Sequence, residues 1–388
     1  MNTIKFGALM NSIFQRYSPF TVSETISYKC VKILLFILVV TQQLSGQDKG
    51  KVLYDRDVLT GAEQTLVYLP LLEGKKVGVV ANQTSMIDNT HLVDSLIALG
   101  VNVVKVFSPE HGFRGKADAG EIVKDGVDLK TGLPLVSLYG GNKKPKLSDL
   151  NGIDIIVFDI QDVGARFYTY ISTMSYVMEA CAESVTDFLV LDRPNPNGFY
   201  VDGPVLDKKN KSFVGLHEIP VVHGMTVAEY ARMVNEEGWL KNGVRCALEY
   251  VKCVNYTHHD YYQLPVKPSP NLPNMTSIYL YPSLCFFEGT TVSVGRGTTE
   301  PFQQYGHPDL PETTYSFVPK STEGAKNPKH MGMKCNGITL VESGTSYMKA
   351  VRELHLKWLM DAYDQYPKKE SFFLSNGFFN LLAGNMEL

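Results

Sequence analysis

Four short apolar runs, each followed directly by polar residues, constrain the fold of this chain more than any other feature. The runs are rich in β-branched residues and alternate with stretches of helical spacing, which predicts parallel strands. In an open parallel sheet, ligands bind beyond the carboxyl ends of the strands. We therefore expect the polar clusters to mark one functional edge. The runs and clusters are Val77–Ala81 before Asn82–Ser85, Val103–Phe107 before Ser108–Gly115, Ile155–Phe158 before Asp159–Arg166, and Phe188–Leu191 before Asp192–Asn197.

Helices are expected between these runs. One is capped by Asn89-Thr90 and ends at Gly100, and a longer one spans about 169–184. Strand, helix and strand in close succession favour right-handed crossovers and a parallel sheet. No Gly-x-Gly-x-x-Gly motif follows the first run, so the sheet is Rossmann-like without a dinucleotide fingerprint.

The sequence changes character after about residue 205. Thr226 and Glu229 form a capping box at the start of a further helix. Residues 264–273 are rich in proline and residues 281–301 in glycine and threonine, which is typical of functional loops. We expect an α/β protein with a Rossmann-like parallel-sheet domain over 47–205 and a second, smaller α+β domain over 206–388. The active site is expected in the cleft between them.

The N-terminus has the pattern of a secretory signal peptide. Lysines at 29 and 32 precede the apolar run Ile33–Val40, and the small residues Ser45-Gly46 follow. Eight apolar residues are too few to span a bilayer. We expect residues 1–46 to be removed and the mature protein to be secreted or periplasmic, without a stable membrane span. Residues 1–28, which a signal peptide does not need, are interpreted as an upstream extension of the gene start.

Charge and cysteine content exclude several classes of protein. A formal net charge of −3 with no basic block indicates that the chain does not bind nucleic acid. Beyond Cys30 there are five scattered cysteines, which cannot all pair. Buried free thiols are favoured, with a Cys246–Cys253 bridge as the alternative. No Cys-x-x-Cys or Cys/His zinc spacing is present, and we predict no metal and no cofactor.

Two glutamates are candidates for acid/base chemistry. Glu110 stands at the carboxyl end of a predicted strand, and its alternative role is a surface pair with Arg114. Glu288 follows Phe287, and aromatic neighbours disfavour a charged carboxylate, so we expect its pKa to be raised. Its alternative role is to cap backbone amides. Two carboxylates that face one cleft would be the arrangement of a glycosidase.

Aspartates and arginines recur in the same clusters. Asp159, Asp162 and Arg166 share one cluster, and Asp192-Arg193 belong to another. Such neighbours often pair structurally and orient loops. Alternatively, Arg166, Arg193 and Arg296 bind a substrate carboxylate or phosphate, because the guanidinium fork matches these anions.

Histidines and serines give weaker signals. His111 is interpreted as a residue that orients its neighbour Glu110, and His223 as a candidate to face the cleft. His258-His259-Asp260 resembles a ligand cluster, but adjacent histidines point in different directions. A serine hydrolase is disfavoured because no Gly-x-Ser-x-Gly motif is present.

Several of these stretches together resemble a known family. The chain is similar from about residue 51 to its end to the NamZ-type exo-β-N-acetylmuramidases, peptidoglycan hexosaminidases formerly catalogued as a domain of unknown function. The stretches that carry the resemblance are Asn82–Ser85, Glu110–Gly115, Thr131–Pro134, Ser137–Gly140, Asp159–Thr173, Leu191–Gly198, Pro268–Pro273 and Phe287–Thr298.

The resemblance implies removal of β-linked N-acetylmuramic acid from the non-reducing ends of peptidoglycan fragments. It implies a Rossmann-like domain plus a smaller domain, and it places the catalytic glutamates at Glu110 and Glu288. Substrate-assisted attack by the 2-acetamido group is an alternative to a second catalytic carboxylate. The residues expected to bind substrate are Asn82, His111, Arg114, Asp159, Gln161, Arg166, Tyr168, Asp192, Arg193, His223 and Arg296.

Two other functions stay open at this point. One is a metal-dependent esterase or phosphatase that uses Asp159, Asp162 and His111, and the other is a non-catalytic protein that binds muramyl sugars.

Family members usually continue some tens of residues past Leu388, so the sequence is expected to be truncated at its C-terminus.

Overall fold

A seven-stranded sheet in the order β5-β6-β4-β1-β7-β8-β9 dominates the computed structural model, which describes residues 58–110, 112–114 and 125–388. All neighbouring strands are parallel except β5, which runs antiparallel to β6. The predicted parallel α/β sheet is therefore confirmed. The strands are β1 (Val77–Ala81), β4 (Val103–Ser108), β5 (Gly126–Val127), β6 (Pro134–Ser137), β7 (Ile155–Asp159), β8 (Asp187–Leu191) and β9 (Leu248–Val251). The predicted leader and His111 lie outside the described residues.

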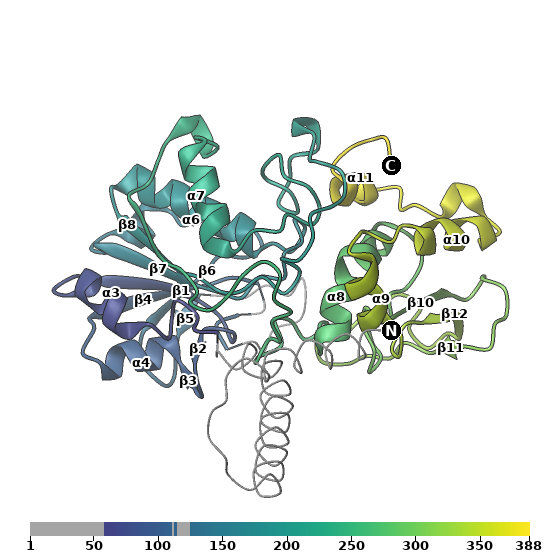
Figure 1. The fold of residues 1–388 in the computed structure, drawn as a ribbon, viewed down its shortest axis with the longest axis horizontal. Coiled ribbons are helices and arrows are strands. Elements are labelled where there is room, and N and C mark those ends of the chain that lie inside the picture. The colour runs from purple at the N-terminus through teal and green to yellow at the C-terminus, as the bar shows by residue number, and fades with distance from the viewer. Residues whose placement is uncertain (1–57, 111, 115–124) are drawn as a thin grey trace, which may run out of the picture. The chain divides into compact units, whose positions relative to one another are not determined.

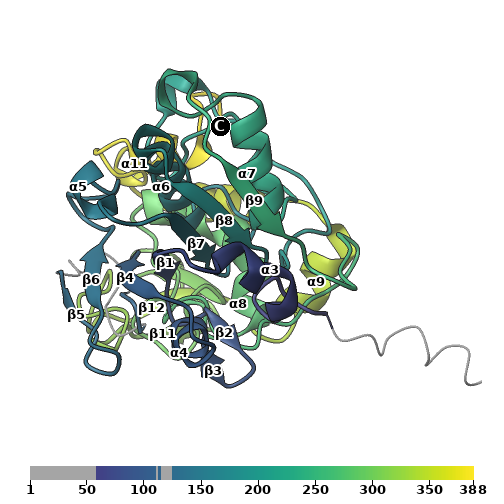
Figure 2. The ribbon, with the colours of Figure 1, turned by 90° about the vertical axis from the view of Figure 1, so that its left-hand side faces the viewer.

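Helices cover both faces of this sheet (Figure 1, Figure 2). Val80 belongs to the core on the face of α6 and α7, whereas Val79 and Ala81 belong to the core on the face of α3 and α4. Successive strand residues point to opposite faces, so burial on both faces requires continuous apolar runs. The helices are α3 (Thr65–Leu72), α4 (Leu92–Ala98), α6 (Tyr170–Ser184) and α7 (Val227–Glu236), with α5 (Leu147–Leu150) beside α6.

Helix α7 begins as the sequence predicts. The Thr226 hydroxyl accepts a hydrogen bond from the Glu229 backbone N–H at 3.3 Å, and the Glu229 carboxylate accepts one from the Thr226 N–H at 2.9 Å. This reciprocal arrangement is a capping box, and it satisfies backbone donors that the helix itself cannot pair.

The predicted cap of α4 is wrong. Asn89 and Thr90 belong to a hairpin of β2 (Met86–Ile87) and β3 (Thr90–His91), and the cap is His91. Its Nδ1 accepts a hydrogen bond from the Val93 N–H at 3.2 Å. The hairpin takes up the residues that would otherwise have capped the helix.

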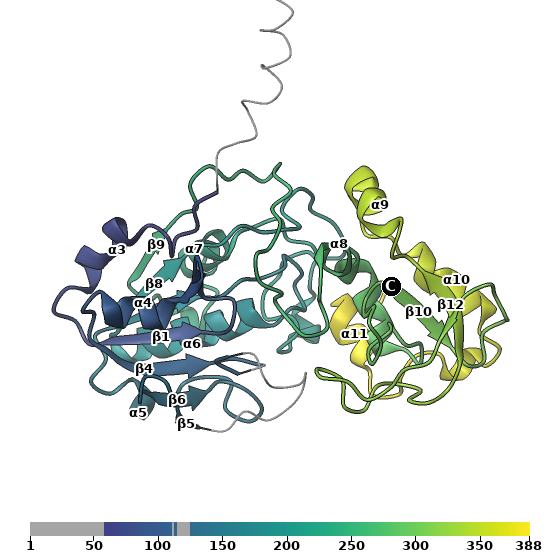
Figure 3. The same cartoon turned by 90° about the horizontal axis from the view of Figure 1, so that it is seen from below.

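A smaller α+β region follows the large sheet along the chain (Figure 3). Its sheet is antiparallel in the order β10-β12-β11. Its elements are α8 (Met275–Leu284), η3 (Cys285–Gly289), β10 (Gln304–His307), β11 (Ser316–Phe317), β12 (Cys335–Thr339), α9 (Gly344–Val351), α10 (Lys357–Gln365), η4 (Lys369–Ser371) and α11 (Phe378–Ala383). Helix α11 packs on η3 so closely that a Cβ atom at Gly289 would lie 2.5 Å from Phe379 Cα.

The short helices η1 (Lys208–Asn210) and η2 (Lys241–Gly243) precede and follow α7. Because β9 lies beyond residue 205 and belongs to the large sheet, with α7 packed on β8 and β9, the sheet extends past the predicted domain boundary. The exact boundary between 205 and 206 stays a prediction.

Cysteines and helix lengths complete the description. All five described cysteines are free thiols, so Cys246 and Cys253 do not form the bridge that was considered. Among the helices of the described residues, none combines the length and the apolar character that a bilayer crossing requires.

Candidate active site

A pocket lies beyond the carboxyl ends of β4 and β7. Glu110, two residues past the end of β4, lines this pocket together with residues 167–170, which follow β7. The smaller region contributes the opposite side. Its pocket-lining residues are Tyr281, Arg296 and Phe302, and the connection before α8 adds Ser269, Asn271 and Leu272. The pocket therefore joins the functional edge of the sheet to the smaller region.

The wall of this pocket is largely aromatic. The Tyr168 ring lies 5.0 Å from the Tyr170 ring and 5.7 Å from the Tyr281 ring, and Tyr281 lies 5.0 Å from Phe302. The Tyr168 hydroxyl donates to the Pro268 carbonyl at 2.9 Å, which fixes its ring. Apolar walls with a few placed polar groups are typical of small-molecule sites.

Glu110 and Arg296 place a carboxyl group and a cation in this pocket. The Thr169 hydroxyl donates to Glu110 Oε2 at 3.4 Å. The Arg296 guanidinium carbon lies 4.9 Å from the centre of the Phe302 ring, a cation–π distance. One pocket thus combines a carboxyl group that can transfer a proton with a cation that can bind an anion.

Glu288 forms a bidentate ion pair with Arg296. Arg296 Nε donates to Glu288 Oε1 at 2.9 Å and Nη2 donates to Oε2 at 2.7 Å, while the side chains are 25% and 22% exposed. Within the described part of the chain Nη1 donates no hydrogen bond, so this nitrogen is left for a ligand. Glu288 is not one of the residues that line the pocket.

The predicted rise in the pKa of Glu288 is not found. Burial raises this pKa, but the positive charge and hydrogen bonds of Arg296, with a contribution from Lys329, outweigh burial and hold the pKa below its ordinary value. Aromatic neighbours in the sequence suggested the opposite, because the arginine that pairs with Glu288 follows eight residues later. Glu288 is an ionised partner and not a proton donor.

Lys329 fixes the backbone around Glu288. Its ammonium group donates to the carbonyls of Phe287, Glu288, Thr290 and Val292 at 3.1, 3.2, 2.6 and 3.3 Å. Burial lowers the pKa of this lysine. Lys329 therefore fixes the backbone of the segment that contains Glu288. Because Glu288 binds Arg296, Lys329 also helps to position Arg296.

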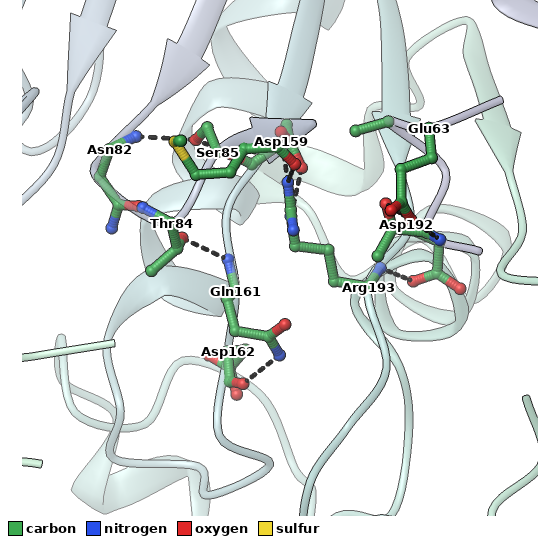
Figure 4. Close-up of polar contacts among 12 residues, drawn as sticks. Glu63, Asn82, Thr84, Ser85, Asp159, Gln161, Asp162, Asp192 and Arg193 are labelled. Atoms are coloured by element: carbon green, nitrogen blue, oxygen red, sulfur yellow. Dashed lines mark hydrogen bonds and ion pairs between the residues drawn. The ribbon is translucent and has the colours of Figure 1, made fainter. Parts of the chain in front are cut away.

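Several predicted substrate-binding residues form a buried network at the ends of β1, β7 and β8 (Figure 4). Arg193 Nη2 donates to Asp159 Oδ2 at 2.8 Å and to the Met86 carbonyl at 3.0 Å. Asp159 is 0% and Arg193 3% exposed. The structural role that was the alternative for these residues is found, but the pair joins the two clusters and does not form within either one.

Asn82 and Gln161 belong to the same network. Asn82 Oδ1 accepts from the Thr84 N–H at 2.9 Å, and the Thr84 hydroxyl accepts from the Gln161 N–H at 3.0 Å. Gln161 Nε2 donates to the carbonyls of Asp162 and Pro194 at 2.8 and 2.7 Å. These hydrogen bonds connect and fix the loops that follow β1, β7 and β8.

Two buried aspartates have raised pKa values. Burial raises the pKa of Asp162 to about 7, although its Oδ1 accepts from the Gly164 N–H. Burial likewise raises the pKa of Asp192 to about 6. Asp192 accepts hydrogen bonds from the Thr226 hydroxyl and the Ala228 N–H, both at 2.9 Å, so it anchors the start of α7.

Arg166 and His223 are placed differently from the prediction. Arg166 is 1% exposed and donates to four backbone carbonyls, those of Pro204, Ile219, Leu382 and Ala383. These bonds connect α11 to the segments around Pro204 and Ile219, and Arg166 does not line the pocket. His223 is also buried, and burial lowers its pKa to about 4, so it is neutral.

Arg114 has a structural partner as well. Its Nε and Nη2 donate to the two carboxylate oxygens of Asp128 at 2.9 and 2.7 Å. A second carboxylate, of Asp94, lies 3.5 Å away. The alternative of a Glu110–Arg114 surface pair is thus replaced by a bidentate pair with Asp128.

The metal-dependent alternative names Asp159, Asp162 and His111. Asp159 is paired with Arg193, and His111 lies outside the described residues.

Of the predicted site residues, the structure brings Glu110, Tyr168 and Arg296 to the pocket. Sequence reasoning missed Tyr170, Tyr281 and Phe302. Tyr170 lies in the Asp159–Thr173 stretch and could have been found there. Tyr281 and Phe302 gave no signal, because aromatic residues in such positions are usually core.

Comparisons with known proteins identify the family of this chain. The sequence model described as the N-terminal part of exo-β-N-acetylmuramidase NamZ matches residues 77–276, and the model of its C-terminal part matches residues 279–388. Peptidoglycan β-N-acetylmuramidase NamZ of Bacillus subtilis is 40% identical over 374 residues, which cover 91% of this chain and 88% of that protein.

Two crystal structures of DUF1343 family proteins from Bacteroides fragilis have the same fold. One is 49% identical with a TM-score of 0.79, covering 85% of this chain and 89% of that chain. The other is 30% identical with a TM-score of 0.71, covering 84% and 89%.

Proposed function

This chain belongs to the exo-β-N-acetylmuramidase NamZ family and is a glycosidase of that class; we propose that it releases β-linked N-acetylmuramic acid from the non-reducing ends of peptidoglycan fragments. The observation that carries the proposal is the presence of Glu110 and Arg296 in one aromatic-walled pocket. N-acetylmuramic acid has a lactyl carboxylate, and this anion distinguishes it from N-acetylglucosamine.

In this proposal Arg296 binds the lactyl carboxylate. Its fork is already oriented by Glu288 through Nε and Nη2, and Nη1 donates to the ligand in this proposal. A guanidinium held in place loses less side-chain entropy when it binds an anion. The rings of Tyr168, Tyr281 and Phe302 pack against the apolar face of the sugar.

Glu110 acts as the general acid. Its proton passes to the glycosidic oxygen while the bond from that oxygen to C1 of muramic acid breaks. Because both carboxylate oxygens of Glu288 are bound to Arg296 and Glu288 does not line the pocket, we propose that the 2-acetamido oxygen of the substrate forms the new bond to C1. Water then attacks C1, the bond to the acetamido oxygen breaks, and the Glu110 carboxylate takes the proton of the water.

The experiment is release of 4-nitrophenol from 4-nitrophenyl β-N-acetylmuramide, beside the matching β-N-acetylglucosaminide, with and without EDTA. Release from the muramide that is selective and resistant to EDTA is the expected result. A folded protein that binds the muramide without releasing nitrophenol would instead be a muramyl-sugar binding protein.

We also propose that the protein acts outside the cytoplasm, as a secreted or periplasmic enzyme. The signal-peptide pattern of residues 29–46 supports this, and so does the location of peptidoglycan outside the cytoplasmic membrane. N-terminal sequencing of the protein from fractionated cells should give a mature chain that begins after Gly46. Full-length protein in the cytoplasmic fraction would contradict this proposal.

A further inference from the structure

The connection before α8 contributes a buried asparagine to the Glu110 pocket. Asn271 lines this pocket together with Glu110 and Arg296, although it is only 3% exposed. Buried side-chain amides usually have hydrogen-bond partners at both their oxygen and their nitrogen. An amide atom that faces a pocket without a partner is therefore a candidate to bind a ligand.

The hydrogen bonds of Asn271 fix the orientation of its amide. Its Nδ2 donates to the Gly324 carbonyl at 2.7 Å, and its backbone N–H donates to Ser269 Oγ at 3.2 Å. Among the described residues, Oδ1 accepts no hydrogen bond. The amide cannot flip without losing the bond to Gly324, because an amide oxygen donates nothing to a carbonyl. Oδ1 is thus the atom left for a ligand, and it can only accept a hydrogen bond.

Contacts on two sides hold the turn that carries Asn271. On one side, the Tyr168 hydroxyl donates to the Pro268 carbonyl at 2.9 Å. On the other side, Gly324 packs so closely that a Cβ atom there would lie 2.5 Å from Pro270 Cβ, and its φ of +85° suits glycine. The position of Asn271 is therefore set before a ligand binds, which reduces the entropy lost on binding.

One loop connects Asn271 to Arg296. The Lys320 N–H donates at 2.8 Å to the carbonyl of Gly297, the residue after Arg296. Four residues further along the same loop, the Gly324 carbonyl accepts from Asn271. The loop therefore supports both the segment of Arg296 and the side chain of Asn271, and both residues line one pocket.

We propose that Asn271 Oδ1 accepts a hydrogen bond from the N–H of the substrate's 2-acetamido group and thereby positions this group for its attack on C1. This role rests on the proposed function, in which Arg296 binds the lactyl carboxylate. The lactyl group is attached at C3 of the sugar and the acetamido group at the neighbouring carbon, C2. Residues supported by one loop would thus bind neighbouring substituents of one sugar.

The reaction requires an acceptor and not a donor at this position. The acetamido oxygen attacks C1, and a donor beside it would bind that oxygen and weaken the attack. A hydrogen bond from the acetamido N–H to Oδ1 instead shifts electron density toward the oxygen and orients it toward C1. No covalent bond to Asn271 forms or breaks.

The test compares Asn271→Leu with a matched control, Asn336→Leu. Asn336 is also buried, and its Nδ2 donates to the Leu310 carbonyl at 3.0 Å, but it does not line the pocket. Each enzyme is assayed on 4-nitrophenyl β-N-acetylmuramide and on the analogue in which an acetoxy ester replaces the 2-acetamido group. The ester keeps the carbonyl oxygen and lacks the N–H.

The measured quantity is the ratio of kcat/KM for the amide to that for the ester. In Asn271→Leu we expect this ratio to fall about three- to tenfold below that of wild type and control, from the loss of one neutral hydrogen bond. Asn271→Asp should keep most of the ratio, because a carboxyl oxygen can accept the same N–H. A ratio in Asn271→Leu equal to that of the control would overturn the proposed hydrogen bond, as would an equal loss in Asn271→Asp.

Calorimetric titration with the methyl β-glycosides of the same two sugars separates this role from the proposed function. If wild-type protein cleaves no muramide, the proposed function fails, and the titration still decides whether Asn271 binds the acetamido N–H. A preference for the amide sugar that is smaller in Asn271→Leu than in Asn336→Leu supports the hydrogen bond. Equal preferences in the two variants overturn it.

Discussion

Two arginine–carboxylate pairs in this protein have the same chemistry and opposite surroundings. Arg193 and Asp159 are 3% and 0% exposed beneath the ends of the strands, whereas Arg296 and Glu288 are 25% and 22% exposed, and Arg296 lines the pocket. Each guanidinium binds its carboxylate through two nitrogens. The buried pair can only fix loops, while the accessible pair presents an oriented cation. The two pairs contain similar residue types, so their different burial determines which pair has a structural role and which can bind a ligand.

The largest effect is expected at the carboxyl group that faces the accessible arginine. Glu110→Gln removes the proton donor and should lower kcat on the nitrophenyl muramide by about 10²–10⁴-fold. The melting temperature should stay within a few degrees of wild type, because Glu110 is half-buried at the pocket. A Glu110→Gln enzyme with wild-type kcat would contradict its role as the acid.

Breaking the buried Arg193–Asp159 pair should lower the stability of the fold. Arg193→Met leaves the Asp159 carboxylate buried without its partner, and the free energy of unfolding should fall by about 3–5 kcal/mol. Urea denaturation followed by fluorescence measures this. Arg296→Met provides the matched comparison, with a smaller expected loss, because Glu288 is 22% exposed and Lys329 still contributes a positive charge near it. Equal losses would remove the distinction between the two pairs.

Much of the fold could be predicted from the sequence, because parallel strands buried on both faces need continuous apolar runs. The runs at 77–81 and 188–191 coincide with β1 and β8 to within a residue. The capping box at Thr226 and Glu229 was also predictable, since it depends on two residues in one turn. The α4 cap was not, because the β2–β3 hairpin competes for the same residues.

The site was less predictable, because its contacts join distant parts of the chain. Arg166 looked like an anion-binding residue, but its acceptors at Leu382 and Ala383 lie more than 200 residues away in the sequence. Asp159 and Arg193 meet because β7 and β8 are neighbours in the sheet. Patterns within one loop could suggest a charged pair, but not which pair is accessible.

Acid should lower the stability of the fold through a buried histidine, His217. Burial lowers the pKa of His217 to about 4 from its ordinary value of 6.5. The unfolded chain therefore binds a proton that the folded chain does not. The stability from this histidine is complete above pH 6.5 and falls as the pH drops toward 4, by up to about 2 kcal/mol at pH 5.

Unfolding free energies of wild type and His217→Gln, measured between pH 4.5 and 8, test this. The variant should lose less stability toward acid than wild type. His259→Gln, at an exposed histidine, should follow the wild-type curve. Parallel curves for wild type and His217→Gln would show that His217 does not titrate in this way.

Glu288→Gln gives the smallest effect and the sharpest distinction between two roles. If Glu288 positions Arg296, its loss should raise KM for the muramide about tenfold, with kcat changed less than threefold, because only the orientation of a charged hydrogen-bonding group is disturbed. Steady-state kinetics on the nitrophenyl muramide separate the two constants. If turnover instead dropped by about two orders of magnitude while KM stayed unchanged, Glu288 would be a catalytic base.

The most direct test of the central claim is the ratio of kcat/KM for 4-nitrophenyl β-N-acetylmuramide to that for the β-N-acetylglucosaminide, in wild type and Arg296→Met. The lactyl group that carries the carboxylate is the only difference between the two sugars. We predict that wild type strongly prefers the muramide and that Arg296→Met loses at least tenfold of this preference while it still cleaves the glucosaminide at the wild-type rate. An unchanged ratio in a folded Arg296→Met enzyme would contradict the assignment of the accessible pair to substrate recognition.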